Sequence, residues 1–415
     1  MRKDDVIVIG GGLSGLIAAA ASAKRGKKVT LLSFGMGTMT IGSGIIDILG
    51  YDNNAAIVSN PESGVKMVDE DHPYHKIGLQ AVKNSVEFFL NLCREEMYPY
   101  IGNLNEMKWI PTAAGTLKPT CLVPKTIDPD QLKVSDQIYI VGFHGLKDYY
   151  AELVVKNLKV SLGMDRKYEI VMIDHNFSGG RDVTVLDIAR WLDSEDGRAK
   201  CIQQLKNKIK PDSVVLMPPI LGTTPDYLVL DELAKATGCQ LIETMTVPPS
   251  LSGLRLRSML INCLKKLGVR MIEKANVIKS ILEEGKCIAV VTDGIDRERT
   301  YYAQNFILAT GGIYGGGLIS SALGEIKEPI FNIPIQVSVA QENWSNLKLF
   351  SNKKQPFAKI GVDVDNKMRP LDMQGEVLIE NVFVVGRNLQ GYDFCFEKSG
   401  NGVALASGYQ AAMSV

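Results

Sequence analysis

The residues with the clearest chemical meaning stand near the start of the chain, where glycines recur at Gly10, Gly12 and Gly15. This spacing lets the chain turn tightly and brings backbone N–H groups close to a phosphate, and the following helix favours an anion at its N-terminus. The turn stands between an apolar strand, residues 6–9, and an Ala-rich helical segment, residues 13–25. The sequence therefore predicts a nucleotide phosphate here. The residues predicted to contact it are Gly10, Gly12, Leu13, Ser14 and Gly15.

Ser33 bears on the identity of that nucleotide. It follows the second predicted strand, residues 29–32, at a place where an acidic residue commonly binds the hydroxyls of an adenosine ribose. A serine can still form a hydrogen bond to a ribose, so one interpretation is an ordinary FAD or NAD site. The other interpretation is a nucleotide with a phosphate but no adenosine.

Later segments bring glycines and small polar residues to other predicted strand ends. Residues 38–44 (TMTIGSG) follow the second strand, residues 308–312 (LATGG) and 384–388 (VVGRN) end two more strands, and residues 400–402 precede a final helix, residues 403–412. Glycines let the backbone approach a planar ligand, although residues 38–44 could equally form a polar surface turn. The residues predicted to contact a ligand are Thr40, Gly42, Ser43, Gly44, Thr310, Gly311, Gly312, Gly386, Arg387, Asn388, Gly402 and Val403.

The chain offers few candidates for catalysis. Arg255 begins a predicted helix and could clamp a phosphate or carboxylate with two hydrogen bonds, or it could be a helix-end charge. His144 follows an apolar strand, where a proton-transfer role is conceivable, but most lone histidines are structural. No catalytic acid or base is assigned beyond these two candidates.

Composition excludes several classes of protein. Lys plus Arg and Asp plus Glu both number 46, so no net charge attracts nucleic acid. The seven cysteines are scattered without a Cys-x-x-Cys pair, which is typical of reduced cytosolic thiols and argues against a metal or iron–sulfur site in this chain. The N-terminal apolar run resembles a secretory signal, but Asp4, Asp5 and the glycines argue against one. We therefore expect a cytoplasmic protein.

Strand, glycine turn, helix and strand within the first 32 residues form a βαβ unit, which belongs to a parallel sheet. From residue 51 to about residue 249, helices alternate with isolated strands, which indicates an inserted α/β cap domain. We therefore predict an α/β fold with an N-terminal Rossmann-like nucleotide-binding domain. The predicted nucleotide-binding domain comprises residues 1–50, 250–320 and 375–415, and the cap or substrate domain comprises residues 51–249 and 321–374.

These motifs, in this order, resemble large flavoproteins of the succinate dehydrogenase and glycerol-3-phosphate dehydrogenase kind. The segments IYIVGFHGLKDY, VLMPPILG and ILATGGIYGGGL resemble those of the B-subunit family of anaerobic glycerol-3-phosphate dehydrogenase. The resemblance runs from the first strand to the last helix. Its most specific parts are the segments PPSLSGLRL (residues 248–256) and GLKD (residues 145–148).

The resemblance implies a Rossmann-like flavin-binding domain that carries FMN, with FAD as the alternative. It also implies a catalytic partner subunit, which bears FAD and oxidises sn-glycerol 3-phosphate to dihydroxyacetone phosphate. A further iron–sulfur subunit would dock the complex on the membrane, so that this chain contacts the membrane only indirectly. FMN would explain Ser33, since FMN has a phosphate but no adenosine ribose.

Two other functions remain open at this stage. One is an autonomous FAD-dependent oxidoreductase of a small carboxylic acid, similar to fumarate reductase, which would need a catalytic pair such as His144 and Arg255. The other is a non-catalytic scaffold subunit with a vestigial flavin fold.

Overall fold

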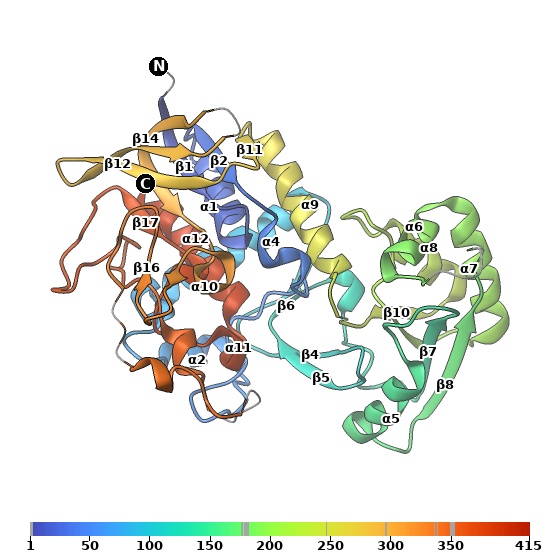
Figure 1. Cartoon of the computed structure of the whole chain (residues 1–415). Helices are drawn as coiled ribbons and strands as arrows, with labels where there is room; N and C mark the ends of the chain where they lie inside the picture. Colours follow the sequence, from blue (N-terminus) through green and yellow to red (C-terminus); the bar gives the residue numbers. More distant parts are fainter. Residues whose placement is uncertain are drawn as a thin grey trace.

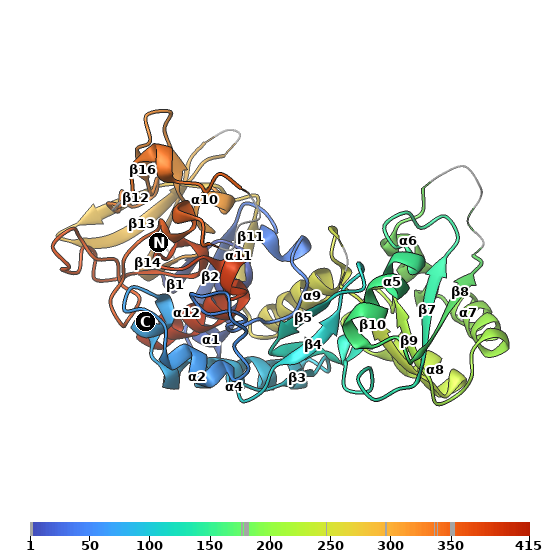
Figure 2. The same ribbon diagram turned by 90° about the horizontal axis from the view of Figure 1, so that it is seen from below.

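The computed structural model describes residues 3–175, 177, 182–245, 247–294, 297–335, 337, 339–348 and 353–415. The chain forms two lobes, each built around its own β-sheet (Figure 1). The larger lobe contains both ends of the chain, drawn in blue and red, and the smaller lobe is formed by the middle of the chain, drawn in green. The second view shows the same separation from below (Figure 2).

A seven-stranded sheet forms the centre of the larger lobe. Its strands are β1 (Lys3–Ile9), β2 (Val29–Ser33), β11 (Arg270–Glu273), β12 (Val277–Glu283), β13 (Lys286–Thr292), β14 (Arg299–Leu308) and β17 (Val382–Val384). The order is β11-β2-β1-β14-β13-β12, and β17 also pairs with β14. β1 runs parallel to both its neighbours and is buried from Val6 to Ile9, which explains its run of four apolar residues.

Four long helices pack in the larger lobe. They are α1 (Leu13–Lys24), α4 (Leu79–Glu95), α9 (Leu251–Lys266) and α12 (Gly400–Ser414). α1 packs against α12, and its four consecutive alanines, residues 18–21, are buried. The two backbones come very close, because a Cβ added at Gly408 of α12 would lie 2.5 Å from the carbonyl oxygen of Ser14.

The smaller lobe is a four-stranded, fully parallel sheet with helices. Its elements are β7 (Gln137–Phe143), α5 (Ala151–Leu162), β8 (Lys167–Ile173), α6 (Val185–Asp193), α7 (Glu195–Lys208), β9 (Val214–Met217), α8 (Leu228–Thr237) and β10 (Gln240–Glu243). The strand order is β10-β9-β7-β8. β7 and β9 are nearly continuous apolar runs because helices cover the sheet.

Shorter elements connect the lobes and surround the larger sheet. The short strands are β3 (Tyr100–Gly102), β4 (Lys108–Pro111), β5 (Leu117–Thr120), β6 (Leu122–Pro124), β15 (Ile319–Ser320) and β16 (Ile326–Lys327). The short helices are α2 (Pro61–Lys66), α3 (Pro73–Ile77), α10 (Gly312–Gly315), α11 (Phe394–Glu397), η1 (Gly37–Thr40), η2 (Lys125–Ile127), η3 (Gln341–Asn343), η4 (Pro356–Lys359) and η5 (Gly386–Asn388). The β4–β5 hairpin reaches the smaller lobe, where the N–H of Ala113 donates to the carbonyl of Met245.

The architecture confirms the predicted α/β class, with an α/β unit inserted between β2 and β11. The strands expected as isolated pieces in the middle of the chain prove to be neighbours in one sheet. The domain boundaries stay a prediction, and they assign α4 to the cap, although α4 packs on α12 in the larger lobe. Within the described part of the chain, no helix combines the length and the apolar character that a membrane span requires.

Candidate cofactor-binding site

A cavity of about 480 Å³ lies where β1, β2 and β14 end, between the N-termini of α1, α9 and α12. Parallel strands in α/β folds place their ligand sites at these carboxyl ends. Half of the residues predicted from sequence line this cavity. They are Gly10, Gly12, Leu13, Ser14, Gly42, Gly44, Thr310, Gly311 and Arg387.

The three glycines of the first turn have different tasks. A Cβ at Gly10 would lie 2.2 Å from the carbonyl oxygen of Ala309, and one at Gly15 would lie 2.0 Å from the carbonyl oxygen of Gly10. These two glycines therefore let β1, β14 and α1 approach closely. A Cβ at Gly12 would have no neighbour within 4 Å, and Gly12 lines the cavity, so its missing side chain leaves room for a ligand.

The N-terminus of α1 is open to the cavity. Gly12 is the residue that precedes the helix, and no side chain caps the first N–H groups. No acidic residue lies in the first turn either. Unpaired N–H groups and the helix dipole at such an end favour a phosphate.

Ser33 does not line the cavity, although its neighbours Leu32 and Phe34 do. Its hydroxyl donates a hydrogen bond of 2.6 Å to the carbonyl of Gly35 and is buried against Gly11. This serine therefore supports the loop after β2. The role predicted for it as a cofactor contact stays untested.

The cavity continues beyond the glycine turn along residues 275–278, where the chain leaves β11 and enters β12. The first of these residues is tied to the loop after β2, because the N–H of Ala275 donates to the carbonyl of Ser33. The side chain of Asn276 donates to Asp293 over 2.8 Å. Nothing in the residue types of this wall marks it as a binding segment, so it was not predicted from the sequence.

Arg387 is the only charged side chain among the described residues that line the cavity. Its guanidinium lies over the ring of Phe394, with 4.1 Å from Cζ to the ring centroid. The preceding residue, Gly386, is next to the start of α1, since a Cβ there would lie 2.6 Å from the hydroxyl of Ser14. Arg387 therefore adds a positive charge beside the open N-terminus of α1.

Asn388 supports the cavity wall from behind. It is fully buried, and its Oδ1 accepts hydrogen bonds from the N–H of Gly312 over 2.8 Å and the hydroxyl of Thr310 over 3.2 Å. Its Nδ2 donates to the carbonyl of Leu308 over 3.2 Å. The side chain thus holds the strand end of β14 and its glycine loop in one conformation, and does not itself line the cavity.

The loop of residues 37–44 packs against the start of α9. A Cβ at Gly253 would lie 2.0 Å from the carbonyl oxygen of Met39, and a Cβ at Gly44 would lie 2.5 Å from the carbonyl carbon of Ser252. Thr40 accepts a backbone hydrogen bond from Ser250, and neither Thr40 nor Ser43 lines the cavity. The spacing of the PPSLSGLRL segment could have identified the missed residue Gly253, since a glycine in the first turn of a helix invites close backbone packing.

The final helix begins three residues earlier than predicted. Gly400, Asn401 and Ala404 of its first turn line the cavity, whereas the predicted residues Gly402 and Val403 face the interior. The N–H of Gly402 donates to the carbonyl of Asp47, over 2.9 Å. Residues three or four positions apart share a helix face. In a helix that starts at Gly400, the cavity face therefore holds residues 400, 401 and 404 instead of the predicted 402 and 403.

Arg255 and His144 lie outside the cavity lining. Arg255 is fully buried and forms two hydrogen bonds to the carboxylate of Glu243, of 2.7 and 2.9 Å, and one of 2.8 Å to the carbonyl of Gly222. Burial lowers the pKa of Arg255, but Glu243 outweighs it, so the pKa lies above its usual value. The His144 side chain is exposed and stands 3.6 Å from Asp174. A catalytic role for either residue stays untested.

A model of the FAD binding domain family matches residues 5–403. The chain is 29% identical to the B-subunit of anaerobic glycerol-3-phosphate dehydrogenase from Vibrio cholerae, over 100% of this chain and 97% of the relative. It is 30% identical to the probable B-subunit of the same dehydrogenase from Halobacterium salinarum, over 99% and 97%. The chain belongs to the B-subunit family of anaerobic glycerol-3-phosphate dehydrogenase. Among solved structures, 3-ketosteroid Δ1-dehydrogenase from Sterolibacterium denitrificans aligns over 100% of this chain and 99% of that chain, with 12% identity and a TM-score of 0.46.

Membership of this family, whose domain is an FAD binding domain, confirms the resemblance identified from sequence and gives the cavity a ligand class, a flavin. The residues fit such a group in two places. The uncapped start of α1, the open space at Gly12 and the charge of Arg387 fit a phosphate. Gly42, Gly44 and Gly253 line the cavity with the first turn of α12, so this wall presents no bulky side chain at these positions to a flat ring.

Proposed function

We propose that this chain is the flavoprotein subunit of an anaerobic sn-glycerol-3-phosphate dehydrogenase, which takes part in oxidising glycerol 3-phosphate to dihydroxyacetone phosphate. The observation that carries the proposal is the cavity at the strand ends, with an uncapped helix N-terminus and one cationic side chain, in a chain similar over its whole length to B-subunit proteins. A bound flavin supplies the redox chemistry, because it exchanges electrons in pairs or singly.

The residues of the chain bind and orient the flavin under this proposal. The N–H groups at the start of α1 and the guanidinium of Arg387 hold its phosphate, since both are positive and close to each other. The first turn of α12, with Gly400 and Asn401, would favour negative charge on the ring that it faces. Leu256 and Met39 contribute apolar surface that excludes water from the ring.

We propose FMN as the flavin. Among the described residues, no acidic side chain lines the cavity, and neither does Ser33, so an adenosine ribose would lack its usual acceptor. A specific observation favours FAD as the second candidate, because the cavity continues along residues 275–278 beyond the phosphate turn.

Mass spectrometry of the cofactor released by heating the purified chain tests this choice. FMN would support the proposal, and FAD would show that the cavity along residues 275–278 holds an adenosine. A chain that contains no flavin and binds none on reconstitution would leave only a scaffold role.

The proposed partners are a catalytic subunit that bears FAD and an iron–sulfur subunit, which would carry the electrons onward to quinone. The B-subunit name of the relatives supports a complex of several chains. We propose that the complex is cytoplasmic and contacts the inner face of the membrane only through a partner. Co-purification with a tagged chain, followed by iron and flavin analysis of the complex, tests this assembly.

Anaerobic reduction experiments separate the proposed role in a complex from an autonomous oxidoreductase. Glycerol 3-phosphate is added to the isolated chain and to the complex, and flavin absorbance is followed. We expect bleaching in the complex. The autonomous enzyme would be favoured by a different result. In that case, the reduced form of a fumarate-type acid, such as succinate, would bleach the flavin of the isolated chain, and glycerol 3-phosphate would bleach neither preparation.

A further inference from the structure

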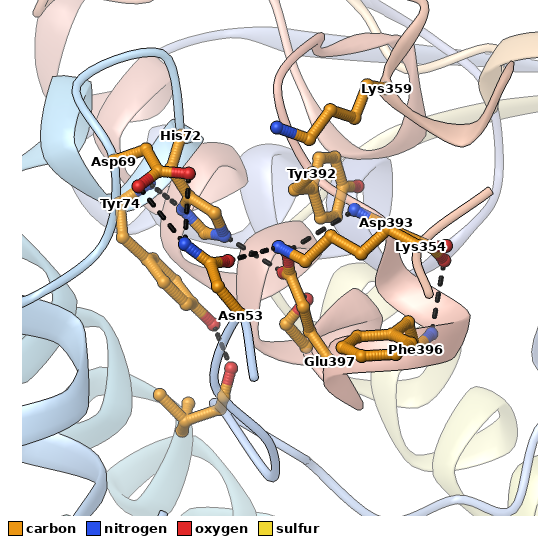
Figure 3. Close-up of polar contacts among 12 residues, drawn as sticks. Asn53, Asp69, His72, Tyr74, Lys354, Lys359, Tyr392, Asp393, Phe396 and Glu397 are labelled. Carbon is orange, nitrogen blue, oxygen red and sulfur yellow. Dashed lines mark hydrogen bonds and ion pairs between the residues drawn. The ribbon is translucent and has the colours of Figure 1, made fainter. Parts of the chain in front are cut away.

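A buried carboxylate lies at the turn that leads into the flavin-side helix α12. Glu397 is the last residue of α11, and three residues later Gly400 begins α12 and lines the cavity. The side chain of Glu397 is only 2% exposed. Figure 3 shows this carboxylate at the meeting point of side chains from three distant segments of the chain.

Four donors satisfy the two oxygens of Glu397. Oε2 accepts from His72 Nε2 over 3.0 Å and from the hydroxyl of Ser399 over 3.0 Å. Oε1 is bonded to Lys354 Nζ and accepts a weaker hydrogen bond of 3.4 Å from the N–H of Asp393. Burial raises the pKa of Glu397, but His72 and Lys354 outweigh burial and lower it, so the group is a carboxylate at neutral pH.

His72 connects the carboxylate to the start of α3. Its Nδ1 accepts from the N–H of Tyr74 over 3.0 Å, so the ring proton is on Nε2 and points at Glu397. The Tyr74 hydroxyl in turn donates 2.8 Å to the carbonyl of Ile48 and lies where a Cβ at Gly402 would be, 2.3 Å away. Tyr74 thus lies against the first turn of α12, and His72 contacts Glu397 just before that turn.

Lys354 connects the same carboxylate to a third segment. Its ammonium donates to Asn53 Oδ1 over 2.6 Å, and Asn53 donates to both oxygens of Asp69, over 3.1 Å each (Figure 3). The backbone of Glu397 adds to this, because its carbonyl accepts from the N–H groups of Gly50 and Tyr51. Segments near residues 50, 72 and 354 are therefore joined at the entry to α12.

This arrangement differs from that of an ordinary surface ion pair. A buried carboxylate is tolerated only with several donors, and here the side-chain donors come from separate segments of the chain, at His72, Lys354 and Ser399. The result is a fixed path for residues 397–400, with Lys398 in the left-handed conformation at φ 53°. No side chain caps α12, and Gly400 and Asn401 of its first turn line the cavity.

We propose that Glu397 is a positioning residue, which acts with His72 and Lys354 to fix the first turn of α12 against the flavin. The inference rests on the proposed flavin site. Loss of either charge of the pair releases the turn between α11 and α12, so both losses weaken flavin binding in the same direction.

Two variants of opposite charge test the inference. Glu397→Gln removes a negative charge, and Lys354→Met removes a positive one. The flavin dissociation constant is measured by fluorescence titration with the flavin that the wild-type chain releases, FMN or FAD. We expect both variants to raise it by about tenfold, in line with the effect of losing a supporting partner behind a ligand shell. The flavin midpoint potential is recorded for each.

A matched control separates positioning from general loss of stability. Glu232→Gln breaks the ion pair with the buried Arg198 in the smaller lobe, away from the cavity. It should lower the melting temperature and leave the flavin dissociation constant unchanged. If the flavin dissociation constant shifts in opposite directions in the two test variants, only charge matters and the inference is overturned. An unchanged dissociation constant in both variants would also overturn it.

If Glu397→Gln does not fold, Lys354→Met alone tests the inference. This variant is expected to fold because the lysine side chain is partly exposed. In that case, an unchanged dissociation constant in Lys354→Met overturns the inference, and a raised one supports it. A wild-type chain without flavin would overturn the proposed function together with this inference. If the wild-type chain contains flavin and the variants leave the flavin dissociation constant unchanged, the inference alone is overturned.

Discussion

The two parallel sheets of this protein use the ends of their strands in opposite ways. In the larger lobe, the strand ends of β1, β2 and β14 surround a cavity lined by glycines and one arginine. In the smaller lobe, the end of β10 carries Glu243, which is paired with Arg255 of α9 from the other lobe. The first set of strand ends is open to a ligand, and the second is closed by a protein side chain.

The difference shows that the size of the residues at the strand ends decides whether space remains there for a ligand. Gly12 leaves space that no protein atom fills. At the end of β9 and β10, the Arg255 guanidinium occupies the corresponding space and binds both Glu243 and the carbonyl of Gly222. A strand-end site can thus hold a cofactor or join two lobes, and the side chains that reach it decide which.

The largest effect is expected from breaking the junction. Arg255→Met leaves the fully buried Glu243 carboxylate without its partner, which should lower the free energy of unfolding by about 3–5 kcal/mol. Denaturant unfolding measures this. Lys279→Met at the exposed pair with Glu298 is the control and should cost about 0–1 kcal/mol. A similar small loss in Arg255→Met would mean that the junction contributes little.

Two glycine variants should distinguish a glycine that leaves room in the cavity from one that lets the surrounding backbone pack closely. Gly10→Ala forces a Cβ onto the carbonyl of Ala309 at φ 119° and should destabilise the fold by about 1–3 kcal/mol or more. Gly12→Ala should leave the melting temperature nearly unchanged and abolish flavin binding, because its methyl group enters open space in the cavity. Flavin content and thermal melting check both. Full flavin content in Gly12→Ala would contradict the placement of the phosphate.

Arg387→Met should have a moderate effect on the cavity alone. A charge-assisted hydrogen bond to a phosphate contributes about 1.5–3 kcal/mol, so the flavin dissociation constant should rise by at least about tenfold. Titration at low and high salt measures it, and the difference from wild type should shrink at high salt. Arg369→Met, which loses a pair with Asp365 away from the cavity, is the control.

The smallest effect concerns acid pH. The folded-state pKa of Glu397 is below the usual 4.5, so the stability that this carboxylate contributes is present above that value and is lost as pH falls through the folded pKa. Between pH 7 and strongly acid pH, the melting temperature should therefore fall less steeply in Glu397→Gln than in wild type. Parallel curves would show that Glu397 has the same pKa folded and unfolded.

Much of the cavity could be predicted from local spacing. Glycine spacing around Gly12, the strand ends at Thr310 and Gly311, and Arg387 all depend on neighbours in the chain, and all line the cavity. The wall of residues 275–278 could not be predicted, because only the pairing of β11 with β2 and the hydrogen bond from Ala275 to Ser33 bring it beside β2.

Arg255 illustrates the limit of sequence spacing. A helix-end arginine in an unusual segment has the properties of a ligand clamp, and only the fold shows that Glu243 lies opposite. The first turn of α12 is a similar case, since a start at Gly400 instead of Val403 exchanges the residues that face the cavity. Helix starts depend on tertiary contacts such as the one between Gly402 and Asp47.

The sequence by itself determined the glycine turn after β1, because the conformation at Gly10 and the room at Gly12 follow from the absence of a side chain. It also determined the alternation of apolar strands and helices that makes an α/β fold. The tertiary structure alone decided which charges meet. Arg255 and Glu243 are twelve residues apart in the chain, and His72 and Lys354 are 325 and 43 residues from Glu397. The energies of these pairs depend on burial that no local pattern shows.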